Sequence, residues 1–280
     1  MPSIRRILSS DFGSYGHKPF VLLYTPRTGS NLLAALLDSH PDVLCHHELF
    51  NPEAPHPSLS VREGAEAFDF GTAAERDAAP DRFLDRVYGE PRGAKAVGFK
   101  LCINDSRSAF WGLLFNRSVK KVFLTRNNTL ESLVSSLIAE KTRTWIDFAR
   151  AEGKSDPEKD AKKGPETIEI DLRQFRGYTR KRRVYGRLMR SIGASTGQSF
   201  TWLDFQDIVA RRGIDELLTE LGVPPGELLR ERTRRQNPAP LRDKISNYDE
   251  VCRALAGTRD AWMIEEAAGE TPNASTVGGA

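Results

Sequence analysis

The sequence has few cysteines and no long hydrophobic run. Its 280 residues include three cysteines, Cys45, Cys102 and Cys252, which stand far apart in or near hydrophobic segments. This spacing favours buried free thiols in a reducing cytosol over a disulfide framework. No apolar run approaches the roughly 20 residues that cross a membrane, and the first residues lack the apolar segment of a signal peptide. We therefore expect a cytoplasmic protein with no membrane span.

Charge of one sign is not in large excess either. The 41 Lys and Arg residues against 38 Asp and Glu residues give a formal net charge of +3, which by itself does not indicate nucleic-acid binding. Residues 173–190 and 230–242 are locally basic, but few aromatic residues stand among them to stack on bases. We expect no nucleic-acid partner. The length suits one large α/β domain or two small ones.

Three familiar motifs are missing. The Walker A pattern G-x-x-x-x-G-K-[ST] is absent, because no lysine follows Gly29 and no glycine stands five residues before it. Neither the dinucleotide pattern G-x-G-x-x-G nor the hydrolase elbow G-x-S-x-G occurs. Trp202-Leu203-Asp204 is at best a weak Walker B match. These absences disfavour a nucleoside triphosphate kinase, a dinucleotide enzyme and an α/β hydrolase.

The stretch from Pro19 to Asn51 predicts a β-α-β unit. Residues 20–24 are apolar enough for a buried parallel strand, and a compact loop follows at 25–30. Leucines then recur on one helical face until Pro41 ends the helix, and residues 43–45 form a second short strand. The unit therefore has polar residues at the ends of two buried strands.

The same alternation continues along the chain and predicts a three-layer α/β/α fold with a central, mainly parallel sheet of about five strands. We expect residues 1–17 to be a loose N-terminal arm and a single domain to cover 18–267. We also expect a mobile charged insertion at about 151–165 and a disordered tail at 268–280. The remaining predicted strands are 96–100, 121–125 and 200–203, and the remaining predicted helices are 110–115, 128–141, 178–192 and 248–266. A helical segment through 208–221 is interrupted by Gly213.

The loop at 25–30 has the composition of an anion-binding site. The N-terminus of a helix offers unpaired N–H groups and the positive end of the helix dipole. Gly29 allows the backbone to come close to a ligand, Thr28 and Ser30 add hydroxyl donors, and Arg27 adds a fixed charge. The alternative is an ordinary turn in which Ser30 or Asn31 caps the helix, but this would leave Arg27 without a partner.

Charged residues gather at one predicted edge of the sheet. Right-handed crossovers place the carboxyl ends of parallel strands together, and ligands bind at that edge. An anionic ligand with an acid or base nearby would suit this edge, although Arg126 alone could be an ordinary surface arginine. The helix after Arg126 adds three serines, any one of which is a candidate phosphate ligand. The edge residues are Arg27, Glu48, Lys100, Arg126 and Asp204, and the serines are Ser132, Ser135 and Ser136.

Glu48 is the best candidate for a general base. It must be partly buried near a reacting hydroxyl so that its pKa rises toward neutrality. His46 and His47 are rivals because histidine titrates near neutral pH. Strand alternation would put His46 and Glu48 on one face and His47 on the other. Adjacent histidines rarely reach one ion, so we expect no metal.

A family resemblance follows from these motifs. Pro26-Arg27-Thr28-Gly29-Ser30 after an apolar strand resembles the 5′-phosphosulfate loop of sulfotransferases that use 3′-phosphoadenylyl sulfate (PAPS). Arg126 with Ser135 is similar to that family's 3′-phosphate motif. Within the family, the chain resembles the bacterial carbohydrate sulfotransferases of the rhizobial nodulation-factor type and, more remotely, of the mycobacterial trehalose type. The matching patches are Thr25–Leu32, His47–Asn51, Asn128–Leu133 and Arg234–Gln236.

The resemblance implies a P-loop-like fold and in-line transfer of a sulfuryl group from PAPS to a hydroxyl of a carbohydrate or glycolipid. Glu48 would be the base, with His46 and His47 still in play, and Lys100 and Arg27 complete the catalytic candidates. The resemblance also favours a homodimer. It assigns the 5′-phosphosulfate to Arg27, Thr28, Gly29, Ser30 and Asn31, and the 3′-phosphate to Arg126, Ser135, Arg234 and Arg235.

Two other functions compete with this interpretation. One is a kinase with a degenerate phosphate loop that uses ATP and Mg²⁺. The other is a non-catalytic protein that binds a nucleotide or RNA. The sequence leaves the acceptor's identity open, and it does not decide which of the three serines contacts the 3′-phosphate.

Overall fold

The computed structural model describes residues 2–58, 60–61, 69–144, 166–225 and 239–265. These residues group into two compact units. The first contains the described parts of Met1–Asn127 and Tyr185–Arg234. The second contains the described parts of Asn128–Trp145, Ser155–Val184 and Arg235–Ala280. The predicted insertion at 151–165 and the predicted tail at 268–280 lie outside the described residues.

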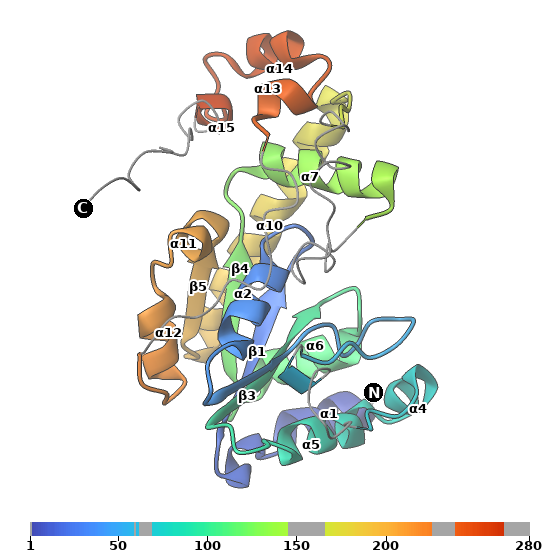
Figure 1. The fold of residues 1–280 in the computed structure, drawn as a ribbon, viewed down its shortest axis with the longest axis vertical. Coiled ribbons are helices and arrows are strands. Elements are labelled where there is room, and N and C mark those ends of the chain that lie inside the picture. Colours follow the sequence, from blue (N-terminus) through green and yellow to red (C-terminus); the bar gives the residue numbers. More distant parts are fainter. Residues whose placement is uncertain (1, 59, 62–68, 145–165, 226–238, 266–280) are drawn as a thin grey trace, which may run out of the picture. The chain divides into compact units, whose positions relative to one another are not determined.

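A five-stranded, all-parallel sheet forms the centre of the first unit (Figure 1). Its strand order is β2-β3-β1-β4-β5. The order reverses at β1, which pairs with β3 on one side and with β4 on the other, so ligands are expected at its carboxyl end. The predicted sheet is confirmed. The strands are β1 (Lys18–Tyr24), β2 (Val43–His46), β3 (Ala96–Cys102), β4 (Lys120–Thr125) and β5 (Phe200–Asp204).

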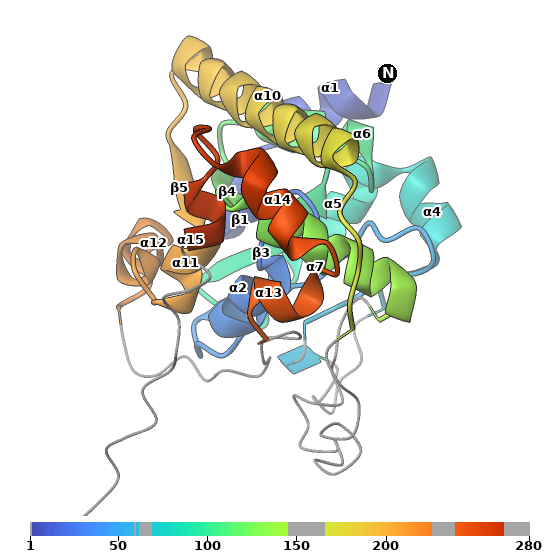
Figure 2. The same cartoon turned by 90° about the horizontal axis from the view of Figure 1, so that it is seen from above.

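Helices cover both faces of this sheet, which confirms the three-layer architecture. Strand residues alternate between faces, so Val21 and Leu23 enter one core while Phe20 and Leu22 enter the other. The first core includes residues of α1, α5 and α6, and the second includes residues of α2 and α12. Figure 2 shows α2 and α6 on opposite sides of the strands. The helices of this unit are α1 (Pro2–Ser9), the 3₁₀ helix η1 (Phe12–Tyr15), α2 (Ser30–Asp38), α4 (Ala73–Ala78), α5 (Pro80–Gly89), α6 (Arg107–Phe115), α11 (Phe205–Val209) and α12 (Ile214–Glu220).

The N-terminal segment is part of the first core, so the prediction of a loose arm at 1–17 is wrong. Ile7 and Phe12 are fully buried. The side-chain amide of Asn116 donates hydrogen bonds to the carbonyls of Ile7 (2.6 Å) and Ser10 (2.8 Å). These contacts come from a residue more than 100 positions away, which is why the local sequence did not reveal them.

The second unit has a hydrophobic core of its own. Leu130 and Val134 of α7 pack with Phe175 of α10 and Val251 of α14. The sequence predicted one domain over 18–267 and did not indicate this separate core. It also predicted one helix over 248–266, which is wrong: the structure has two helices, with Gly257 at φ 70° between them. The helices of this unit are α7 (Thr129–Thr142), the first part of α10, α13 (Leu241–Lys244), α14 (Tyr248–Leu255) and α15 (Trp262–Glu265).

Helix α10 (Leu172–Thr196) contributes to both units and is longer than the predicted helix at 178–192. Its start is stabilised by Asp171, whose carboxylate accepts hydrogen bonds from the backbone N–H groups of Arg173 (2.7 Å) and Gln174 (3.4 Å). Like the other helices in the described residues, α10 does not combine the length and apolar character needed to cross a membrane.

Candidate active site

The loop between β1 and α2 turns sharply at the carboxyl edge of the sheet. Arg27 (φ 66°) and Gly29 (φ 82°) both have left-handed backbone conformations, which suit glycine but are uncommon for arginine. Gly29 is the N-cap of α2 and supplies no side-chain cap. The alternative in which Ser30 or Asn31 caps the helix is therefore wrong. The N-cap leaves the first N–H groups of α2 available to an anion.

Phe205, at the start of α11, supports this loop. A Cβ atom on Gly29 would lie 2.6 Å from the Phe205 ring, so the position excludes a side chain as well as requiring positive φ. The guanidinium of Arg126 stacks 4.1 Å from the centroid of the same ring. Its Nη1 donates to the carbonyl of Arg27 at 3.4 Å. One aromatic ring thus joins the predicted anion-binding groups that follow β1 and β4.

The polar side chains of the loop divide between two roles. Thr28 is fully buried, and its hydroxyl donates to the carbonyl of Thr25 at 2.9 Å, so it stabilises the loop itself. Ser30 is buried at the first position of α2. Asn31, one residue further, accepts a hydrogen bond from the ammonium of Lys100. The loop helix is therefore connected directly to the neighbouring strand β3.

Glu48 follows β2 and is held by three donors. Its Oε1 accepts hydrogen bonds from the ammonium of Lys100 (2.8 Å) and the hydroxyl of Tyr24 (3.1 Å). Its Oε2 accepts one from the side-chain amide of Asn51 (3.0 Å). The Glu48 side chain keeps 22% of its exposure, whereas the Lys100 side chain keeps only 1%. The structure therefore brings together the predicted residues Glu48, Lys100 and Asn31.

The expected rise in the pKa of Glu48 is wrong. Burial acts to raise the pKa, but the Lys100 charge and the hydrogen bonds from Lys100, Asn51 and Tyr24 outweigh it and lower the pKa to about 2. Burial lowers the pKa of Lys100, and the Glu48 carboxylate opposes this shift. Each charge thus stabilises the other, and Glu48 is a carboxylate at neutral pH.

The two histidines are both buried, at 2% exposure for His46 and 1% for His47. Burial, followed by the charge of Arg92, lowers the pKa of His46 to about 3. Its Nδ1 accepts a hydrogen bond from the backbone N–H of Ser58 at 3.2 Å. His46 is therefore a weak base engaged in the packing of its own loop. The carbonyl of His47 accepts the backbone N–H of Lys100 at 3.2 Å, which fixes β2 beside β3.

Asp105 is a further carboxyl that sequence reasoning missed. The turn after β3 folds it back, so its Oδ2 accepts the backbone N–H of Cys102 at 3.0 Å. In the sheet register Cys102 lies beside Tyr24, whose hydroxyl contacts Glu48. Burial raises the pKa of Asp105 to about 6, and the Glu48 charge adds to the rise. The signal in the sequence was a carboxylate three residues after a strand, which many turns contain.

The other predicted residues have their own contacts. Asp204 caps α11, and its carboxylate accepts hydrogen bonds from the N–H groups of Gln206 (3.2 Å) and Asn127 (2.8 Å). Within the second unit, Ser132 is fully buried against Tyr178 at 2.8 Å, whereas Ser135 and Ser136 are half-buried on α7. Arg234 and Arg235 lie outside the described residues. Among the residues that the structure describes, no three His, Cys, Asp or Glu side chains converge as metal ligands.

The first unit is therefore a P-loop-like α/β protein in which the loop before α2 has no side-chain cap and Glu48 is ion-paired with Lys100. No protein-family model matches the chain. Nodulation protein H of Rhizobium tropici is 26% identical over 257 residues, which cover 89% of this chain and 93% of the relative. Nodulation protein H of Rhizobium meliloti strain 1021 is 32% identical over 145 residues, 47% of this chain and 51% of the relative. A second Rhizobium meliloti protein of that name is 24% identical over 243 residues, which cover 84% of this chain and 90% of the relative.

The chain is a distant homologue of nodulation protein H, and the resemblance to the rhizobial proteins is confirmed at this level. Two solved structures are also similar. The sulfotransferase domain of the Synechococcus PCC 7002 olefin synthase has a TM-score of 0.41 at 14% identity, covering 93% of this chain and 90% of that one. A sulfotransferase from Alicyclobacillus acidocaldarius has a TM-score of 0.39 at 17% identity, covering 89% and 94%.

Proposed function

We propose that this protein is a sulfotransferase that moves a sulfuryl group from PAPS to a hydroxyl of a carbohydrate or glycolipid acceptor. The observation that carries the proposal is the buried ammonium of Lys100, which contacts both Asn31 of the loop helix and the Glu48 carboxylate. A cation at this position joins an anion-binding loop to a base. The distant homology to nodulation protein H supports the same function and the carbohydrate class of acceptor.

The donor would bind at the loop after β1. Arg27 and the N–H groups of Gly29, Ser30 and Asn31 suit the 5′-phosphosulfate, because the N-cap residue supplies no side chain to block them. Arg126, stacked on Phe205, suits the 3′-phosphate. Ser135, Arg234 and Arg235 stay predictions of the family resemblance.

The chain's own residues account for the charge changes of an in-line transfer. Glu48 takes the proton as the acceptor oxygen forms its bond to sulfur. Lys100, Arg27 and the loop N–H groups stabilise the negative charge on the bridging oxygen when its bond to sulfur breaks and 3′,5′-ADP departs. Each hydrogen bond to a charged group contributes about 1.5–3 kcal/mol.

Lys100 also controls how basic the Glu48 carboxylate is. While Lys100 contacts Glu48, the carboxylate is a weak base. The phosphosulfate brings negative charge to the loop helix that Lys100 also contacts through Asn31. Attraction of Lys100 to this charge weakens its hold on Glu48 and raises the pKa of the carboxylate. The base is thus activated when the donor is bound.

Titration calorimetry tests the proposed function. Full-length protein is titrated with 3′,5′-ADP, with ATP plus Mg²⁺ and with a short RNA. We expect 3′,5′-ADP to bind without Mg²⁺ and at least tenfold more tightly than the other two ligands. Preference for ATP with Mg²⁺ would support a kinase, and binding of RNA alone would support a non-catalytic binder; either result contradicts the proposal. Transfer of labelled sulfate from PAPS to an added sugar then establishes the reaction.

A further inference from the structure

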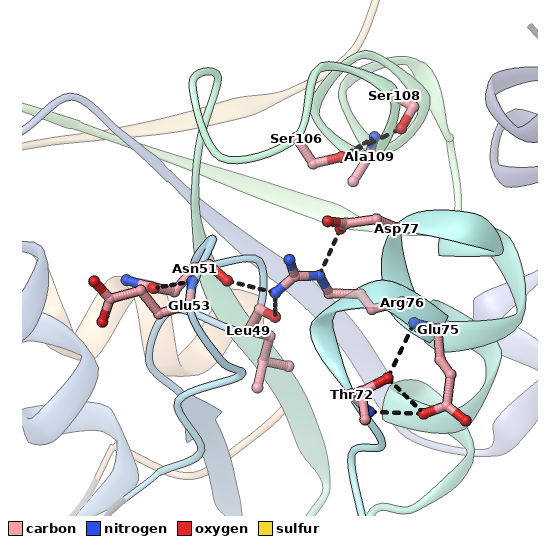
Figure 3. Close-up of polar contacts among 10 residues, drawn as sticks. All are labelled: Leu49, Asn51, Glu53, Thr72, Glu75, Arg76, Asp77, Ser106, Ser108 and Ala109. Atoms are coloured by element: carbon pink, nitrogen blue, oxygen red, sulfur yellow. Dashed lines mark hydrogen bonds and ion pairs between the residues drawn. The ribbon is translucent and has the colours of Figure 1, made fainter.

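Arg76 is a buried cation that belongs to none of the motifs described above. It lies on the short helix α4, begun by a capping box in which Thr72 and Glu75 exchange hydrogen bonds (Figure 3). The residue is 2% exposed and is among the largest fully buried side chains of the described protein. Burying a guanidinium is costly unless its donors are satisfied.

The guanidinium is directed at the loop that carries Glu48. Its Nη1 donates to the carbonyls of Leu49 (3.0 Å) and Asn51 (2.6 Å), and Figure 3 shows the side chain between this loop and Asp77. Nε donates to the Asp77 carboxylate at 2.8 Å, and the Asp77 side chain keeps 59% of its exposure. The buried end of Arg76 therefore binds backbone carbonyls, whereas its ion-pair partner Asp77 faces solvent.

These two carbonyls belong to the residues that fix Glu48. Leu49 follows Glu48 directly. Asn51 returns to it twice, through its backbone N–H to the Glu48 carbonyl (3.1 Å) and through its side-chain amide to Oε2 (3.0 Å). A shift of the 49–51 backbone would move the Asn51 amide and the Glu48 carboxylate together.

We propose that Arg76 is a positioning residue that holds the 48–51 loop so that the Glu48 carboxylate stays in reach of Lys100 and the acceptor hydroxyl. The proposal rests on the proposed function, because it gives Glu48 the role of base. The charge of Arg76 also acts on the neighbouring carboxyl, Asp105, whose pKa it lowers against the larger effect of burial. Loss of Arg76 thus affects the position of the Glu48 carboxylate and the pKa of Asp105.

The test compares three variants of the full chain. Arg76→Gln removes the charge and the second carbonyl contact, Arg76→Lys keeps the charge, and Asp77→Asn removes only the exposed ion pair. For Arg76→Gln we expect kcat per folded molecule to fall about 10- to 100-fold, because small displacements of a catalytic group are costly. The KM for PAPS should stay within about twofold, since the hydrogen bonds described for Arg76 go to Leu49, Asn51 and Asp77. Arg76→Lys should recover part of kcat, and Asp77→Asn should retain it.

A second readout does not depend on turnover. Carbon-13 NMR titration of the Glu48 carboxyl, identified by its loss in Glu48→Gln, should show a higher pKa in Arg76→Gln than in the wild type and an unchanged pKa in Asp77→Asn. Where Arg76→Gln does not fold, Arg76→Lys carries both measurements, because lysine keeps the charge but lacks the Nε donor to Asp77 and the planar group that fixes Nη1 against the two carbonyls.

The outcomes separate the two proposals. An active wild type with an Arg76→Gln variant that keeps full kcat per folded molecule and an unshifted Glu48 titration overturns the positioning role and leaves the sulfotransferase intact. A wild type that neither binds 3′,5′-ADP nor transfers sulfate overturns the proposed function. In that case the Glu48 titration alone decides whether Arg76 holds the loop.

Discussion

The two halves of the site are built in different ways. The predicted anion-binding loop is held by contacts between near neighbours in the sequence. The Thr28 hydroxyl donates to the Thr25 carbonyl, and helix α2 begins at Ser30. The carboxylate half is assembled from distant segments, because Glu48 meets Tyr24 across 24 residues and Lys100 across 52. The loop half has no side-chain cap on its helix, whereas the carboxylate of Glu48 is already paired with Lys100. The difference shows that the loop conformation depends on a short segment of sequence, while the pKa of Glu48 is set by side chains from distant segments.

The sharpest test of the carboxylate half is Glu48→Gln. A positioned base contributes about 10²–10⁴ in rate, so we expect kcat to fall by this factor. The affinity for 3′,5′-ADP should not fall, because Lys100 still contacts Asn31 of the loop helix and no longer faces the Glu48 charge. Steady-state kinetics and calorimetry measure the two quantities.

Asp42→Asn is the matched control for this variant. Asp42 pairs with Lys95 at 2.9 Å, just before β2 and β3 begin, at the opposite end of the two strands that carry Glu48 and Lys100. Removing the Asp42 charge should leave kcat unchanged. Near-wild-type turnover in Glu48→Gln would remove Glu48 as the base.

The next largest effect is expected from Lys100→Met. Breaking a buried ion pair leaves one charge unpaired, which destabilises a protein by about 3–5 kcal/mol. Lys95→Met breaks the exposed pair on the same two strands and should cost less than about 1 kcal/mol, since the Lys95 side chain is 60% exposed. Urea unfolding at pH 7 measures both. If Lys100→Met and Lys95→Met lost the same unfolding free energy, burial of the Lys100 ion pair would not matter for stability.

For Lys100→Met we also expect the unfolding free energy to depend on pH in the opposite direction to that of the wild type. In the wild type the pKa of Glu48 is about 2 when folded, against an ordinary value of 4.5, so its stabilisation is present above 4.5 and lost as the pH falls toward 2. Without Lys100, we expect burial to outweigh the remaining hydrogen bonds from Asn51 and Tyr24 and to raise the pKa of Glu48 above 4.5. The unfolding free energy of Lys100→Met should therefore rise as the pH falls through this higher pKa. In the wild type, Glu48 gives no such rise over the same pH range.

Gly29→Ala tests the loop half. The substitution forces a Cβ atom to within 2.6 Å of Phe205 and keeps a φ of 82°, so we expect a loss of about 2–4 kcal/mol in unfolding free energy. Binding of 3′,5′-ADP should weaken at least tenfold as the loop shifts. Gly222→Ala is the control, because Gly222 has a φ of 74° with no atom near its added Cβ. It isolates the backbone cost of about 1–2 kcal/mol.

Asp105→Asn should give the smallest change, and it should be stabilising. The pKa of Asp105 is raised from 3.8 to about 6, so the folded state loses stability as the pH rises through this window. Removing the charge should stabilise the protein by about 1–2 kcal/mol at pH 7, after allowance for partial exposure. The gain should disappear below pH 4. Thermal unfolding at pH 4 and pH 7 gives the comparison, and equal gains at both pH values would contradict the shift.

The sequence alone determined the sheet and the loop. Short apolar runs such as 20–24 can be buried on both faces only in a parallel sheet, and Gly29 before a leucine-rich helix marks a tight strand-to-helix turn. Gly213 was correctly expected to break the helical segment after β5 and has a φ of 73° between α11 and α12. These features depend on neighbours within a few residues.

Only the tertiary structure decided the rest. Phe205 reaches Gly29, Arg76 reaches the carbonyl of Asn51, and Lys100 reaches Glu48, each across at least 25 residues. No local pattern encodes such contacts, and the pKa of Glu48 depends on them because desolvation and a buried countercharge oppose each other. The sequence thus placed a glutamate at the end of a strand, and the fold made it a carboxylate with a pKa of about 2.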